Sequence, residues 1–130
     1  MAVGRIAISL PAEQLARLEK FVREKAYASR SKAVADILRA HFMKEEWNAG
    51  RAGSAAIVFL FNHRSPSILH PLTHVQHNFA DVIISTTHAH IEKERCIEVI
   101  LAKGKPSRIR ALADALQRLR GIELVRLAAL

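Results

Sequence analysis

The stretch Val82–Ala102, VIISTTHAHIEKERCIEVILA, decides the fold of this chain. Residues 82–91 and 96–102 are rich in β-branched and apolar side chains, and the charged residues 92–95, EKER, separate them. Two such runs joined by a short polar turn are typical of paired antiparallel strands. The stretch therefore predicts a β-hairpin.

The segments on either side of this hairpin complete a β-α-β-β-α-β pattern. The patterns predict a strand at 55–61, a helix within 66–79, a helix beginning near Pro106 and a last strand at 122–127. Pro71 either kinks the first of these helices or marks its true beginning. Residues 54–130 are therefore expected to form a ferredoxin-like (ACT-like) domain, which makes the fold class α+β.

The N-terminal part has a different pattern, one strand followed by two helices. In residues 5–10, RIAISL, apolar and small or polar side chains alternate, and Pro11 suits the start of a helix. Ser29 or Ser31 is expected to cap the second helix. A single strand with two helices leaves both strand edges unpaired and buries too little apolar surface. We therefore expect this part to fold as a dimer in which two strands pair.

A polar segment separates the two patterns. Residues 44–53, KEEWNAGRAG, combine charges with two glycines and indicate a helix end that runs into a linker. The predicted organisation is a first domain at 1–46, a linker at 47–53 and a second domain at 54–130.

Composition limits the classes of protein that this chain fits. The 130 residues are 50% hydrophobic and carry a net charge of +8, which indicates a globular domain and permits nucleic-acid binding. No apolar run approaches the roughly 20 residues of a membrane span, and the N-terminus lacks a signal-peptide core. A single cysteine fits a reducing compartment. A cytoplasmic protein without a membrane partner is expected.

Four candidate metal ligands follow the spacing H-x10-H-x-H-x5-C: His77, His88, His90 and Cys96. Residues two apart on a strand face the same side, so His88 and His90 can chelate one ion. Such residues are more often surface or core side chains than ligands. If they bind metal, the donor set favours Ni(II), Cu(II) or Zn(II), and the spacing alone does not name the ion. Four protein ligands leave no vacancy for catalysis in a four-coordinate site, so an enzyme is not expected.

Two further observations concern residues near this donor set. Glu98 lies two residues beyond Cys96 on the same strand face, where it either orients a ligand imidazole or pairs with a charge of the hairpin. His70, His74 and His77 fall on one helix face, which is either a weaker second site or a solvated surface.

The polar face of the N-terminal strand suits DNA. A two-stranded ribbon fits the major groove, where Arg5 can read guanine and the methyl group of Ala7 can contact thymine. Ser9 can reach a base or a phosphate, while Arg30 and Ser31 at a helix start suit phosphates. The alternative is a solvated strand face.

Almost the whole chain, residues 3–127, resembles the NikR-type nickel-responsive regulators, which belong to the ribbon-helix-helix repressors. The residues that carry the resemblance are RIAISL (5–10), YASRSKAVADILR (27–39), Gln76-His77, THAH (87–90), CIE (96–98) and Lys103-Gly104. The resemblance implies that 1–46 is a ribbon-helix-helix DNA-binding domain and that 54–130 binds metal and forms a tetramer.

The resemblance also implies a ligand set and partners. His88, His90 and Cys96 of one subunit would bind one nickel ion (Ni2+) together with His77 of the partner subunit. The implied assembly is a homotetramer of two ribbon-helix-helix dimers that represses transcription at a palindromic operator in double-stranded DNA.

Two positions depart from the family pattern. Lys32 stands where the family typically has an acidic residue that helps form a cation site, and Ala7 stands where the ribbon usually carries a hydroxyl. A ribbon-helix-helix regulator that responds to Zn, Co or Cu, or a metal-independent antitoxin-like autorepressor, is the alternative interpretation.

Overall fold

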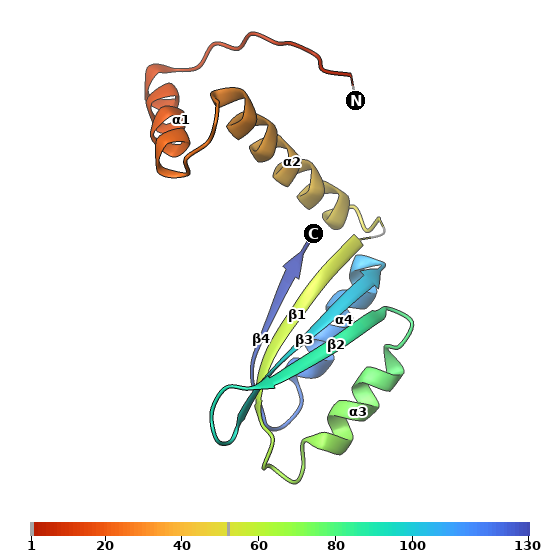
Figure 1. Cartoon of the computed structure of the whole chain (residues 1–130). Helices are drawn as coiled ribbons and strands as arrows, with labels where there is room; N and C mark the ends of the chain where they lie inside the picture. The colour runs from red at the N-terminus through yellow and green to blue at the C-terminus, as the bar shows by residue number, and fades with distance from the viewer. Residues whose placement is uncertain (1, 52) are drawn as a thin grey trace. The chain divides into compact units, whose positions relative to one another are not determined.

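The computed structural model describes residues 2–51 and 53–130, and these divide after His41 into two compact units. Met1 and Ala52, which belong to the predicted first domain and linker, lie outside the described residues. Figure 1 shows the elements of both units in chain order.

The first unit contains helix α1 (Ala12–Glu24) and the beginning of helix α2 (Arg30–Asn48). Ala26 adopts φ 53°, which ends α1, and the Tyr27 ring lies 5.4 Å from the Phe21 ring. Ser29 caps α2, because its hydroxyl oxygen accepts a hydrogen bond from the backbone N–H of Lys32 at 3.1 Å. The two helices predicted from the sequence are present.

The strand predicted at residues 5–10 is not formed in this single chain. Residues 2–11 form neither a helix nor a strand. A strand exists only when its backbone groups bond to a neighbour, and the described residues of the first unit form no other strand. The paired ribbon therefore stays a prediction about the assembly.

The segment predicted as a linker, 47–53, includes the end of α2 at Asn48 and the start of a strand at Gly53. Trp47 is 7% exposed and belongs to the hydrophobic core of the second unit, and the guanidinium of Arg110 lies 5.3 Å from its ring centre. Burying a side chain of this size holds the helix end to the core, so this segment does not behave as a free polar linker.

The second unit has the predicted β-α-β-β-α-β order. Its elements are β1 (Gly53–Asn62), α3 (Leu69–Asn78), β2 (Ile83–His90), β3 (Arg95–Gly104), α4 (Pro106–Gln117) and β4 (Ile122–Ala129). The strands form one antiparallel sheet in the order β2-β3-β1-β4. The parallel strands β1 and β2 are separated by β3, and the parallel strands β3 and β4 are separated by β1. This is the predicted split arrangement. Pro71 lies in the first turn of α3, so it marks the beginning of this helix.

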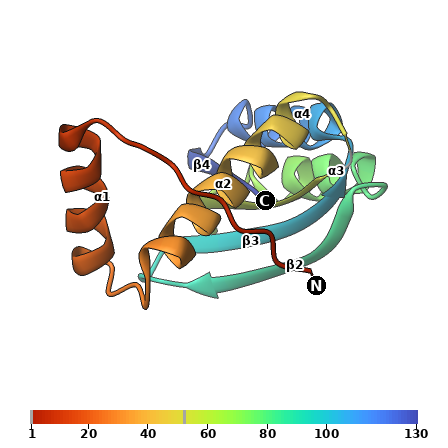
Figure 2. The ribbon, with the colours of Figure 1, turned by 90° about the horizontal axis from the view of Figure 1, so that it is seen from above.

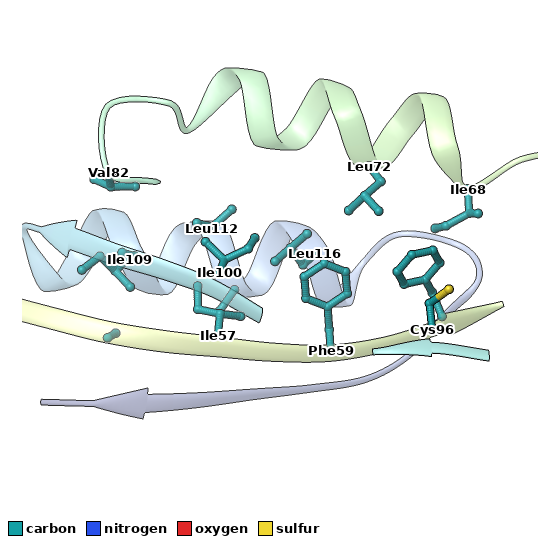
Figure 3. Close-up of a cluster of buried hydrophobic side chains, with 14 of the residues drawn as sticks. Ile57, Phe59, Ile68, Leu72, Val82, Cys96, Ile100, Ile109, Leu112 and Leu116 are labelled. Carbon is teal, nitrogen blue, oxygen red and sulfur yellow. The ribbon is translucent and has the colours of Figure 1, made fainter. Parts of the chain in front are cut away.

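One face of the sheet carries the core. Alternate residues of β1 are buried, and α3 and α4 cover this face of the sheet (Figure 2). A row of side chains that includes Ile57, Phe59 and Ile100 fills the space between the sheet and the helices (Figure 3). No helix formed by residues 2–51 and 53–130 is long and apolar enough to cross a membrane.

The opposite face of the sheet carries a group of apolar side chains that are at least partly exposed. Leu101 of β3 is 46% exposed and Leu124 of β4 is 36% exposed. They share this face with Val58, Leu60, Ile97 and Val99, because these residues alternate with the buried positions of β1 and β3. We refer to these six residues as the outer sheet face.

Candidate metal centre

Cys96 lies on the inward face of β3 and is 1% exposed. Figure 3 shows it at one end of the row of core side chains, next to the turn that leads into α3. Burial, and then the nearby carboxylate of Glu98, raise the pKa of the Cys96 thiol above its ordinary value. The free protein therefore holds this sulfur as a thiol, and a metal ion that binds it must displace the proton.

His90 is placed against Cys96 by the pairing of β2 with β3. The two residues are direct cross-strand partners, so their side chains project from the same face. The Nδ1 atom of His90 lies 3.2 Å from the Sγ atom of Cys96.

His63 reaches the same sulfur from the other neighbour of β3. Phe61 of β1 is the direct partner of Cys96, and His63 lies two residues further along, so it has the same facing. Its backbone N–H donates to the carbonyl of Glu94 at 3.0 Å, which fixes the backbone just beyond β1. The Nδ1 atom of His63 lies 3.4 Å from Sγ of Cys96, and the rings of His63 and His90 are 4.7 Å apart.

These three side chains fit a metal ion of the borderline-soft class. Ligand atoms of His63, His90 and Cys96 all lie within 4.8 Å of one another. Metal–sulfur bonds of about 2.3 Å and metal–nitrogen bonds of about 2.0–2.1 Å place two donors of one ion roughly 3.1–3.6 Å apart, depending on the bond angle. The two Sγ–Nδ1 distances, 3.2 and 3.4 Å, fall within this range. One thiolate and two imidazoles are donors that Ni(II), Cu(II) and Zn(II) accept.

Sequence analysis did not assign His63 to the metal site. The available signal was its facing, two residues beyond the last core position of the strand at 55–61. This signal is useful only if β1 is known to lie next to β3 in a particular register. Spacing along the chain does not provide that register.

His88, a predicted ligand, lies two cross-strand pairs further from the sulfur. Its direct partner is Glu98, while its ring centre lies 6.0 Å from that of His90. His88 and His90 therefore face the same side, as two residues apart on a strand must. Within the described residues, the three side chains whose ligand atoms lie close enough to bind one ion are those of His63, His90 and Cys96, so His63 takes the place of His88 in this group.

Glu98 links this strand pair to α3. Its side chain is 7% exposed, and its Oε1 accepts a hydrogen bond from Nε2 of Gln76. Burial raises the pKa of the Glu98 carboxyl, while the hydrogen bond from Gln76 and the charge of His88 oppose that rise. Glu98 thus lies between a strand histidine and the residue that precedes His77.

His77, the fourth predicted ligand, is exposed in the last turn of α3. It is not part of the three-residue group within the described chain. The ligand role that the resemblance gives to His77 of the partner subunit therefore stays a prediction about the assembly.

The residues predicted to contact DNA lie in the first unit. Arg5, Ala7 and Ser9 are exposed in the segment without regular structure. Arg30 and Ser31 are exposed at the start of α2, and Nη1 of Arg30 lies 3.4 Å from a carboxylate oxygen of Glu19.

Lys32 and Asp36 form an ion pair one turn apart on α2. The hydrogen bond from Lys32, together with its charge and that of Arg39, lowers the pKa of the Asp36 carboxyl. The lysine that departs from the family pattern therefore places a positive charge directly on this carboxylate.

An α+β domain that gathers a thiol and imidazoles on one face of its sheet has the donor set of a protein that binds borderline-soft metal ions. Residues 54–130 match the family described as the NikR C-terminal nickel-binding domain. A chain from Methanocaldococcus jannaschii, named "putative nickel-responsive regulator", is 37% identical over 97% of this chain and 91% of its own length. A chain of the same name from Thermococcus kodakarensis is 35% identical over 95% of this chain and 90% of its own. The chain belongs to the NikR family of nickel-responsive regulators, a family of regulators and not of enzymes.

A solved structure supports the fold alone. An uncharacterized protein from Thermotoga maritima superposes with a TM-score of 0.55 at 18% sequence identity. The similarity covers 62% of this chain and 99% of the Thermotoga chain.

Proposed function

We propose that this protein is a cytoplasmic, nickel-responsive transcriptional repressor. His88, His90 and Cys96 would bind one Ni2+ per subunit together with His77 of the partner subunit. The observation that carries the proposal is the 3.2 Å approach of His90 to the buried Cys96 sulfur in a chain of the NikR family. One thiolate and three imidazoles form a complete four-donor set of the kind that suits planar Ni(II).

The outer sheet face supports assembly through the second unit. Six apolar residues on β1, β3 and β4 would stay partly or largely exposed if the chain were a monomer. Burial of such a surface against a second copy gains about 25 cal/mol for each Å² removed from water.

The first unit supports a dimer that binds DNA. A hollow of about 880 Å³ is lined by apolar side chains of the N-terminal segment, α1 and α2. Ile6 is 78% exposed and Ile8 is 58% exposed along this hollow. Pairing of residues 5–10 from two copies would cover these side chains. It would also direct Arg5, Ala7 and Ser9 outward, where a two-stranded ribbon enters the major groove of a palindromic operator.

Regulation requires a coupling free energy between the two parts of the assembly. Nickel favours DNA binding only if the ion binds more tightly to the arrangement in which both ribbon-helix-helix dimers engage the operator. A ligand set divided between subunits provides this difference, because the ion gains its fourth donor only in one arrangement of the homotetramer.

Two substitutions test the proposal by opposite effects. DNA selected from a random pool by the nickel-loaded wild type serves as the probe in gel shifts. Cys96→Ala is expected to weaken nickel binding at least tenfold and to abolish the nickel-dependent shift. Arg5→Ala is expected to keep nickel binding and to lose about 1–3 kcal/mol of discrimination for the selected DNA. An unchanged nickel-dependent shift in the Cys96 variant rules out the metal site, and full selectivity in the Arg5 variant rules out the ribbon.

A further inference from the structure

We propose that His63 is an alternative metal ligand. With it, one subunit binds Zn(II) through His63, His90 and Cys96, and no ligand from a second subunit is needed. This inference rests on the proposed function, because it concerns the same cysteine and adds a second way of occupying it. His63 would distinguish two ions: zinc would bind within one subunit and leave DNA binding unchanged, whereas nickel would bind between subunits and promote DNA binding.

The geometry of a single chain already gathers the three donors. Nδ1 of His63 and Nδ1 of His90 approach the Cys96 sulfur at 3.4 and 3.2 Å, from β1 and β2 on either side of β3. All three ligand atoms lie within 4.8 Å of one another. None of these positions depends on another subunit.

The position of His63 is held by contacts other than those of its ring. Its backbone N–H donates to Glu94, and the guanidinium of Arg64 lies 3.1 Å from the Glu94 carboxylate. Asn62 accepts a hydrogen bond from the backbone N–H of Arg64 at 2.9 Å. The turn after β1 is therefore tied to the hairpin, so the ligand set has little backbone freedom to lose on binding an ion.

The number of donors decides which ion this set prefers. Zn(II) has no geometric preference from its d electrons and accepts three protein ligands and a water in a tetrahedral site. Planar Ni(II) favours a complete set of strong nitrogen and sulfur donors. Nickel therefore binds more tightly when His88 and His77 of the partner subunit complete its ligand set. Zinc needs only His63, His90 and Cys96 of one chain. Zinc bound in this way would not bridge subunits.

The test compares three histidine variants of the full-length protein. His63→Ala removes the ligand, His63→Gln replaces it with a side chain of similar reach, and His70→Ala removes an exposed histidine of α3 as the control. Affinities for Zn(II) and Ni(II) are measured by competition with a chromophoric chelator. The visible spectrum of the Co(II)-loaded protein reports the coordination number. Circular dichroism confirms that each variant is folded.

Both His63 variants are expected to bind Zn(II) at least tenfold more weakly and to change Ni(II) affinity by less than threefold. The tetrahedral Co(II) bands are expected to weaken in them and to persist in His70→Ala. Unchanged zinc binding, or equal losses for zinc and nickel, would overturn the role of His63. Failure of the proposed function has a different signature, because then Cys96→Ala would bind nickel as the wild type does.

Discussion

At the scale of single residues, the candidate metal centre is a buried thiol next to imidazoles. The cysteine is inside the core, where burial raises the pKa of its thiol, and the sulfur can therefore act as a ligand only by losing a proton to solvent. The same burial keeps the metal-free sulfur protonated and protects it from oxidation, since the thiolate is the reactive form.

This proton predicts a pH dependence of nickel binding. Between about pH 7 and about pH 8.5 a thiol with a raised pKa still carries its proton. Binding then releases one proton, so the apparent nickel affinity is expected to rise by up to roughly tenfold per pH unit. Titrations in non-coordinating buffers measure the slope.

Cys96→Ala is the control for this slope, because it removes the group that releases the proton. Its weaker nickel affinity is expected to be nearly constant over the same interval. In the metal-free protein, the free energy of unfolding changes with pH in the opposite direction. The raised thiol pKa contributes stability that is lost as pH rises through this pKa. A wild-type nickel affinity that does not change with pH would show that the thiolate is not the ligand.

The residues of the centre differ in how far the sequence predicts them. The shared facing of His88 and His90 follows from the two-residue period of a strand, because that period is local. His63 lies beside Cys96 only because Phe61 pairs with Cys96 across β1 and β3. That register joins segments separated by a helix and another strand, so the sequence pattern alone does not reveal it.

At the scale of elements, the sequence predicts the β-α-β-β-α-β order well, because each strand and helix has its own period. The junction before β1 was predicted less well, because a single tryptophan in the polar run KEEWNAGRAG has no period. The structure shows that α2 continues into this run as far as Asn48 and brings Trp47 to the start of β1. A Cβ atom added at Gly53 would lie 2.8 Å from Cε3 of this ring.

This close approach predicts that Gly53→Ala destabilises the second unit. The added methyl group must displace the buried Trp47 ring, and such overpacking typically costs about 1–3 kcal/mol. Thermal or urea unfolding measures the loss. Gly4→Ala is the matched control, because nothing lies within 4 Å of its added Cβ, and it is expected to unfold as the wild type does. Equal stability of the two variants would show that the tryptophan does not pack on β1.

At the scale of the whole molecule, two apolar surfaces remain uncovered, one in each unit. The first lines the hollow of the N-terminal unit and includes Ile8. The second is the outer sheet face. The sequence predicts the first, since one strand and two helices bury too little surface alone. The second follows from the structure, because it depends on both helices covering the same side of the sheet.

The two surfaces are expected to serve different functions, and a lysine substitution in each surface tests the two functions separately. Leu101→Lys puts an unpaired charge in the outer sheet face, which costs several kcal/mol if a partner covers it. Tetramers are expected to dissociate to dimers, and nickel affinity is expected to fall at least tenfold because the ligand from the other subunit is lost. Ile8→Lys is expected to disrupt the N-terminal dimer and DNA binding while nickel affinity stays within about threefold. Ser107→Lys adds the same charge at an exposed position of α4 and serves as the control. Analytical ultracentrifugation with nickel titration distinguishes the outcomes. A Leu101 variant that stays tetrameric with full nickel affinity would show that the outer sheet face does not hold the tetramer together.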